Sequence, residues 1–185
     1  MKCKIFLIII IALSSCSEKT QFINEFNCEV AVFQNLERIE DVKKLFSVYY
    51  PDSWKTNLYY DKNQSSIYTA DTTKQLKETM LLDISHISSE LVFDSNFIKK
   101  FNSNLKQQQL TEISSNQILF RDKPTFYSEA KGFKNKFKYS VLNLFIKLNE
   151  KNYIHSTIEV YGDSLIRKRI CKGINLLEKA IFKRL

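Results

Sequence analysis

Two stretches near the end of the chain, 138–148 and 153–161, alternate apolar and polar residues with the two-residue period of a β-strand. The polar run 149–152 between them is typical of a hairpin turn. The apolar residues of the first stretch share one strand face, and they are Leu142, Leu144, Ile146 and Leu148. A strand with one apolar face has to bury it against a second layer. The alternation therefore restricts the chain to an antiparallel sheet with a covering layer.

Other segments supply more strands and the covering helices. Short runs rich in β-forming residues lie between polar turns, and they are 45–50, 56–61, 65–70, 79–87, 117–120 and 125–131. Asp94 or Ser95 can cap a helix that extends to about Gln109, with an apolar stripe of Phe97, Phe101 and Leu105. A C-terminal amphipathic helix starts at Gly162, and its stripe is Ile166, Ile170, Ile174, Leu177 and Ile181. The predicted class is α+β, with helices packed on an antiparallel β-sheet.

The first fifteen residues have the three-part build of a secretory signal peptide. Lys2 and Lys4 precede the apolar run 5–13, which is too short to span a bilayer as a helix, and two small residues lead to Cys16. An ordinary signal peptide with an incidental cysteine is the simpler alternative. We expect a signal peptide over 1–15, a tether over 16–27 and a single domain over 28–185.

The sequence Leu13-Ser14-Ser15-Cys16 resembles the lipobox of bacterial lipoproteins at every position. The resemblance implies that the Cys16 thiol receives a diacylglyceryl group and that cleavage leaves Cys16 as the first residue. Two or three acyl chains anchor a protein stably, because each buried methylene contributes about 0.8 kcal/mol. The expected location is the cell membrane or the outer membrane, with the domain held in the periplasm or at the cell surface.

The charge of the chain narrows the choice of partner. The formal net charge of +8 becomes +6 once Lys2 and Lys4 are removed with the signal peptide. Basic charge on an exported protein suits anionic lipid headgroups, lipopolysaccharide or an acidic protein. Cytosolic nucleic acid is out of reach, so we expect no nucleic-acid binding.

Two cysteines remain for the folded domain once Cys3 is cleaved off and Cys16 is lipidated. Cys28 and Cys171 can form one disulfide in an oxidising compartment. They can equally be two separately buried thiols, because free cysteine packs as a small hydrophobic residue. The sequence leaves both alternatives open.

The segment Phe46-Ser47-Val48-Tyr49-Tyr50-Pro51-Asp52-Ser53-Trp54-Lys55 resembles the opening motif of PsbP/Mog1-like domains. The order of the later predicted elements also matches that fold, over about 30–185. The resemblance implies a domain whose relatives are mostly binding proteins, and it brings no catalytic residues with it. Trp54 is expected to pack over the sheet and Pro51 to end the strand.

Candidate catalytic and metal-binding residues are sparse. His86 and His155 lack the spacing of a metal motif, and chance placement at sheet edges is the simpler interpretation. Asp83, Ser85 and His86 are close in sequence, but neighbouring residues of a strand point to opposite faces and cannot form a triad by themselves. We expect no metal and no cofactor. The paired carboxylates of a glycoside hydrolase need no fixed sequence spacing, so this kind of active site stays an alternative, although no pattern in the sequence favours it.

One segment has the composition of a contact surface. Aromatic and basic residues alternate across a predicted hairpin tip, and they are Phe133, Lys134, Lys136, Phe137 and Lys138. These residues suit lipid headgroups or an acidic protein face. The simpler interpretation is a solvated hairpin whose alternation turns the aromatic rings inward and the lysines outward.

The sequence as a whole predicts a lipid-anchored cell-envelope protein that acts as a non-catalytic binding or accessory module. The alternatives are an envelope-polymer hydrolase and an immunity or chaperone protein for a secreted toxin.

Overall fold

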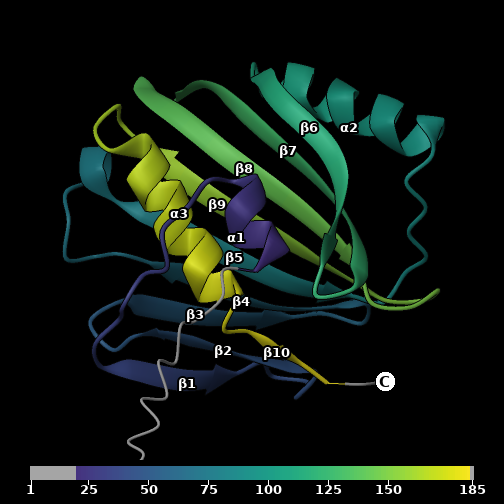
Figure 1. Ribbon diagram of the computed structural model, residues 1–185, viewed down its shortest axis with the longest axis horizontal. Coiled ribbons are helices and arrows are strands. Elements are labelled where there is room, and N and C mark those ends of the chain that lie inside the picture. Colours follow the sequence, from purple (N-terminus) through teal and green to yellow (C-terminus); the bar gives the residue numbers. More distant parts are fainter. Residues whose placement is uncertain (1–19, 184–185) are drawn as a thin grey trace, which may run out of the picture.

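The computed structural model describes residues 20–183. A seven-stranded antiparallel sheet in the order β3-β4-β5-β9-β8-β7-β6 forms its centre (Figure 1). The strands are β3 (Lys55–Tyr60), β4 (Gln64–Ala70), β5 (Met80–Ile87), β6 (Thr111–Phe120), β7 (Lys123–Lys134), β8 (Phe137–Lys147) and β9 (Tyr153–Tyr161). The predicted hairpin between 138–148 and 153–161 is confirmed as β8 and β9, with Leu142 opposite Ile158 and Ile146 opposite Ile154.

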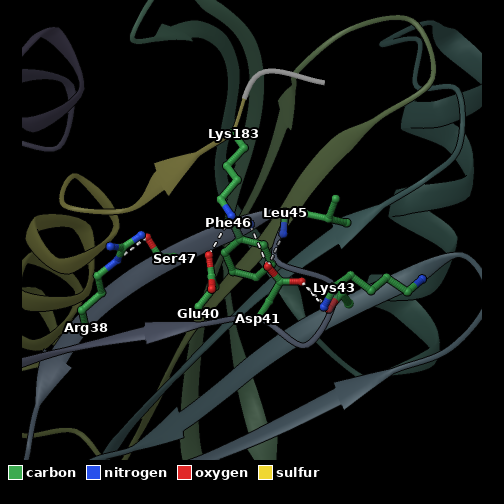
Figure 2. A network of polar contacts seen from close by, with 9 residues as sticks. Arg38, Glu40, Asp41, Lys43, Leu45, Phe46, Ser47 and Lys183 are labelled. Atoms are coloured by element: carbon green, nitrogen blue, oxygen red, sulfur yellow. Dashed lines mark hydrogen bonds and ion pairs between the residues drawn. The ribbon is translucent and has the colours of Figure 1, made fainter.

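A smaller sheet in the order β1-β2-β10 lies beside the large one (Figure 1). Its strands are β1 (Leu36–Glu40), β2 (Phe46–Pro51) and β10 (Ile181–Phe182). The turn between β1 and β2 is organised by the buried carboxylate of Asp41 (Figure 2). That carboxylate accepts hydrogen bonds from the backbone N–H groups of Lys43, Leu45 and Phe46, and from the Ser65 hydroxyl of β4. The Asp41 side chain therefore links the two sheets, which also share an apolar core.

The helical elements are α1 (Gln21–Glu25), the 3-10 helix η1 (Leu76–Glu78), α2 (Ser95–Gln107) and α3 (Ile166–Leu177). The predicted helix of 95–109 is confirmed as α2, where the Asp94 carboxylate accepts a hydrogen bond from the Phe97 N–H at 2.8 Å. The C-terminal helix is shorter than predicted, because it ends at Leu177 and Ile181 lies in β10. Phe182 packs near Phe120, and pairing with β2 gives the backbone of this segment its hydrogen bonds.

The prediction of a tether over 16–27 is wrong for residues 20–27. Thr20 caps α1, and Phe22, Ile23 and Phe26 are buried in the core. Their spacing places three apolar side chains on one side of a short helix, where burial outweighs the polar neighbours. Residues 20–27 are therefore part of the folded domain. Cys16 and the predicted signal peptide lie outside the described residues, in which no helix is long and apolar enough to cross a bilayer.

The two faces of the large sheet carry separate apolar cores. One core contains residues from α1, α3 and the smaller sheet together with Leu142, Leu144 and Ile146 of β8. The other contains α2 residues such as Phe101 and Leu105, packed on Val141 of the same strand. Because neighbouring residues of β8 belong to different cores, α1 and α3 cover one face and α2 covers the other.

A disulfide joins Cys28 to Cys171, whose Cα atoms lie 5.4 Å apart. It ties the segment after α1 to the middle of α3. Of the two arrangements that the sequence leaves open, the structure contains the bonded one.

A candidate binding groove on the second face of the sheet

The face of the large sheet that α2 covers is apolar beneath this helix and polar beyond it. The apolar part is formed mainly by β7 and β8, with Phe126 and Ala130 on the first and Val141 on the second. Further along, the strand register places two rows of polar residues across β4, β5 and β9. One row contains Tyr68, Asp83 and Thr157, and the other contains Ser66, Ser85 and His155. The second face therefore offers a polar surface beside an aromatic core.

A groove with a volume of about 890 Å³ lies elsewhere, and a second groove of about 520 Å³ lies on this face. The smaller groove is bounded by the C-terminal end of α2, the β7–β8 hairpin and strands β8 and β9. Its lining includes Leu110, Phe133, Lys134, Tyr139, His155 and Glu159. Two residues of the predicted partner surface, Phe133 and Lys134, therefore line it together with one of the two histidines.

Lys134 and Glu159 form the charged centre of this groove. The Lys134 Nζ lies 3.1 Å from a Glu159 carboxylate oxygen and sits over the rings of Tyr139 and Tyr161, at 4.9 and 5.7 Å. The Tyr161 hydroxyl donates to the same carboxylate at 3.3 Å. Burial opposes the charge of Lys134, but Glu159 and Tyr161 outweigh it, so the pKa of this lysine is raised. The groove therefore contains the charged ammonium group of Lys134, and the Glu159 carboxylate that pairs with it is largely buried.

His155 is a neutral, packed side chain in the floor of the groove. Its ring stacks on Phe145 with 4.2 Å between centroids, and Nε2 lies 3.3 Å from the Asn143 Oδ1. Burial lowers the pKa of His155 to about 4. An imidazole in these surroundings stays uncharged at neutral pH and serves as a flat contact surface.

Asp83 and Ser85 lie on the same face as His155, but the three do not form a catalytic triad. The Ser85 hydroxyl donates to the Asp83 carboxylate at 3.0 Å and shares a hydrogen bond with Ser66 at 2.8 Å. In a triad the serine bonds to the histidine, and the carboxylate bonds to the other side of the ring. Burial raises the pKa of Asp83 to about 6, against the opposing effect of the Ser85 hydrogen bond.

The β7–β8 hairpin projects beyond its neighbouring strands. Pairing with β6 ends at Lys131 and pairing with β9 ends at Tyr139, so the residues between them form a two-stranded ribbon. Asn135 and Lys136 make the turn with φ angles of 52° and 69°, as in a type I′ hairpin. The ribbon therefore has no third strand on either side.

The prediction that the aromatic rings of this hairpin turn inward is wrong. Phe133 is 66% exposed and Phe137 is 36% exposed, because the ribbon extends past the layers that bury the rest of the sheet. Lys134 pairs with Glu159, and Lys138 lies 2.7 Å from an Asp163 oxygen. Within residues 20–183, Lys136 makes no ion pair. The hairpin tip thus displays two phenylalanines among three lysines.

The two histidines lie on opposite faces of the sheet and cannot share a ligand. In the register of β5 and β9, His86 lies opposite Ile154, and the neighbouring Ser85 lies opposite His155. Because successive residues of a strand point to opposite faces, the two histidine side chains lie on opposite faces of the sheet. Its side chain is buried on the core face, where neither ring nitrogen has a hydrogen-bond partner among the described residues. The prediction of sheet-edge positions is wrong, because β5 and β9 are adjacent central strands. Between Thr20 and Lys183 no cluster of three metal-ligating side chains occurs.

Sequence reasoning missed several residues of the groove, chiefly Tyr139, Asn143 and Glu159. The alternation of β8 and β9 already places them opposite the apolar core residues, on the face of His155. Aligning the two strands across the turn at 149–152 would have brought them together. The sequence contains no comparable signal for the position of α2, which forms one wall.

Comparison with known proteins identifies the fold. No protein-family model matches the chain, and no curated protein matches its sequence. Among solved structures, the cyanobacterial PsbP of Synechocystis sp. PCC 6803 has a TM-score of 0.57 at 12% identity, covering 84% of this chain and 97% of that one. The Ran-binding protein Mog1p of Saccharomyces cerevisiae has a TM-score of 0.54 at 9% identity, covering 81% and 96%. A Pseudomonas aeruginosa protein of unknown function has a TM-score of 0.51 at 8% identity, covering 82% and 100%.

The chain is therefore an α+β protein with the PsbP/Mog1-like fold, as the segment from Phe46 to Lys55 predicts. At these identities the likeness extends to the fold alone.

Proposed function

We propose that this protein is a lipid-anchored, non-catalytic binding module of the bacterial cell envelope, and that it binds a protein partner through the β7–β8 hairpin and the adjoining groove. The observation that carries the proposal is the pair of exposed phenylalanines at the tip of a projecting ribbon. An exposed aromatic pair at a place that packing does not require is typical of a contact surface.

The hairpin offers enough apolar area to anchor a partner. Phe133 is 66% exposed, so covering its ring removes roughly 100–150 Å² from water and contributes about 3 kcal/mol. Phe137 adds a smaller area on the opposite face of the ribbon, because it lies opposite Lys134 while Phe133 lies opposite Lys138. Anchors of this kind are the residues on which protein interfaces most depend.

The lysines around the two phenylalanines indicate the chemistry of the partner. Lys134, Lys136 and Lys138 surround the tip, and two of them already pair with carboxylates of this chain. A partner with an apolar pocket rimmed by carboxylates would replace those contacts and pair with Lys136 as well. Charge complementarity of this type speeds encounter and selects among partners.

A binding role also agrees with the state of the polar residues on this face of the sheet, in the groove and beside it. The Ser85 hydroxyl is already hydrogen-bonded to Asp83 and Ser66. The His155 ring is neutral and stacks on Phe145. The yeast neighbour of the same fold is described as a Ran-binding protein, which is consistent with a fold that serves as a platform for protein contacts. The anchor is supported by the likeness of residues 13–16 to a lipobox.

Site-specific photo-crosslinking in the intact cell tests the proposal. A photoreactive phenylalanine analogue replaces Phe133 or Phe137 in one set of proteins and Tyr60 in the control. Tyr60 is a matched position, because it is 67% exposed on β3. We expect a discrete adduct at positions 133 and 137 that is absent at position 60. Adducts of equal yield at all three positions, or at none, would contradict the proposal.

The identity of the crosslinked protein then distinguishes an accessory subunit from a chaperone or immunity role toward a secreted toxin. Turnover of an envelope polymer by the purified protein would overturn the non-catalytic part of the proposal.

A further inference from the structure

The proposed lipid anchor leaves very little chain between the bilayer and the folded domain. Cys16 precedes Thr20 by four residues, which span at most about 14 Å when fully extended. Thr20 is already part of the domain, since it caps α1 and its hydroxyl donates to the Glu178 carboxylate at 2.5 Å. The part of the surface around Thr20 therefore has to stay close to the membrane.

That part of the surface belongs to the side of the molecule formed by α1 and α3. Thr20 lies where α1 begins and α3 ends, and Figure 1 shows these two helices together in front of the large sheet. The helix α2 and the candidate groove lie on the opposite face, as the two separate cores require. A short tether at Thr20 therefore keeps the α1–α3 side near the membrane and leaves the α2 side farther from it.

The chemistry of the α1–α3 side suits a lipid surface. The larger groove, of about 890 Å³, lies between α3 and the segment 29–33. Exposed apolar side chains border it, with Val30 at 43%, Val32 at 93% and Leu165 at 68% exposure. Apolar side chains that have no packing role here can enter the headgroup region of a bilayer.

Basic residues follow the same side of α3. Lys168 and Lys172 lie one helical turn apart in α3, and Lys179 is exposed in the turn that follows the helix. Lys172 lies 3.5 Å from an Asp71 oxygen, whereas Lys168 and Lys179 make no ion pair with any residue of the described part. Lysines beside a bilayer that contains anionic lipid each contribute favourably to contact.

We infer that the α1–α3 side rests on an anionic bilayer, with Val30, Val32, Leu165, Lys168 and Lys179 as its contact residues. The inference rests on the proposed lipid anchor. The domain then holds a fixed orientation, and α2 with the candidate groove faces away from the membrane. Two layers of about 10 Å each separate the contact side from α2.

Depth-dependent fluorescence quenching tests the orientation. The mature acylated protein is reconstituted into vesicles of phosphatidylcholine and phosphatidylglycerol that contain spin-labelled lipid headgroups. A fluorophore is attached through a single introduced cysteine, Val32→Cys or Lys179→Cys on the contact side, or Lys100→Cys on α2. Lys100 is a matched position, because it is an exposed residue of a helix on the other face. We expect strong quenching at positions 32 and 179 and little at position 100.

Charge reversal provides the second measurement. Each lysine beside an anionic bilayer changes the ratio of domains that touch the bilayer to domains that do not by about fivefold. K168E/K179E should therefore lose most of the quenching at position 32, whereas K99E/K100E on α2 should keep it. Failure of the protein to float with the vesicles would contradict the anchor itself. Flotation with equal quenching at positions 32, 100 and 179, or with the strongest quenching at position 100, would overturn the orientation while leaving the anchor intact.

Discussion

Asp41 should be among the most sensitive positions of the fold, although it lies far from the candidate groove. Its carboxylate is 1% exposed and accepts from the N–H groups of Leu45 at 2.6 Å, Phe46 at 2.7 Å and Lys43 at 3.0 Å. It also accepts from the Ser65 hydroxyl of β4 at 2.6 Å, which links the two sheets. Asp41→Ala leaves at least two of these donors buried without a partner.

Each buried donor that loses its partner costs about 1–3 kcal/mol. Asp41→Ala should therefore lower the free energy of unfolding by about 3–5 kcal/mol, and Ser65→Ala, which removes one partner of the four, by about 1 kcal/mol. Urea denaturation at pH 7 measures both, with the fluorescence of Trp54 as the probe, since it is the single tryptophan of the chain. A loss of less than 1 kcal/mol for Asp41→Ala, equal to that of Ser65→Ala, would refute the role assigned to this carboxylate.

Three further predictions concern the disulfide, the buried titrating groups and a strained turn. Cys171→Ser opens a loop of 143 residues and should cost about 2–5 kcal/mol, and reduction of the wild type should have the same effect; thiols that alkylate without a reductant would contradict it. The pKa of Asp83 is raised to about 6, so its ionisation destabilises the fold as the pH rises from about 4 to about 6. The pKa of His155 is lowered to about 4, so its contribution is lost as the pH falls from about 6.5 to about 4. The two effects oppose one another, and Asp83→Asn should make the loss of stability on acidification from pH 6.5 to 4 steeper than in the wild type; an unchanged pH profile would contradict this. Gly162 has a φ of 78°, and an added Cβ would lie 2.0 Å from a backbone oxygen, so Gly162→Ala should lower the melting temperature by about 5–8 °C; a shift of less than about 2 °C would contradict it.

The strands with one apolar face were predictable because their alternation is strict. The residues of 153–161 form β9 with the predicted bounds, and β8 begins and ends one residue before the predicted 138–148. By contrast, β1 and the first half of β6 were missed. These strands have mostly exposed or half-buried side chains on both faces, so their sequences carry no apolar period.

Errors at the ends of the domain have a common cause, which is packing between segments distant in sequence. Phe22 lies in a polar stretch and is buried against Phe120, 4.9 Å away between ring centroids. Ile181 continues the period of α3 but leaves the helix to pair with Ser47. A local pattern carries no information about these partners.

The candidate groove was predictable only in part. Phe133, Lys134 and His155 stand out in the sequence, but the wall formed by the end of α2 depends on how that helix packs. The exposure of Phe133 depends on where the neighbouring strands end, which the alternation within one hairpin does not specify.

Both the proposed function and the proposed orientation depend on acylation at Cys16. Mass spectrometry of the N-terminal peptide of the protein purified from membranes tests this most directly. We expect a chain that begins at Cys16 and carries a diacylglyceryl group on the thiol. An N-terminal peptide that retains residues 1–15, or one that begins elsewhere with an unmodified thiol, would contradict the anchor and the membrane-facing role of the α1–α3 side.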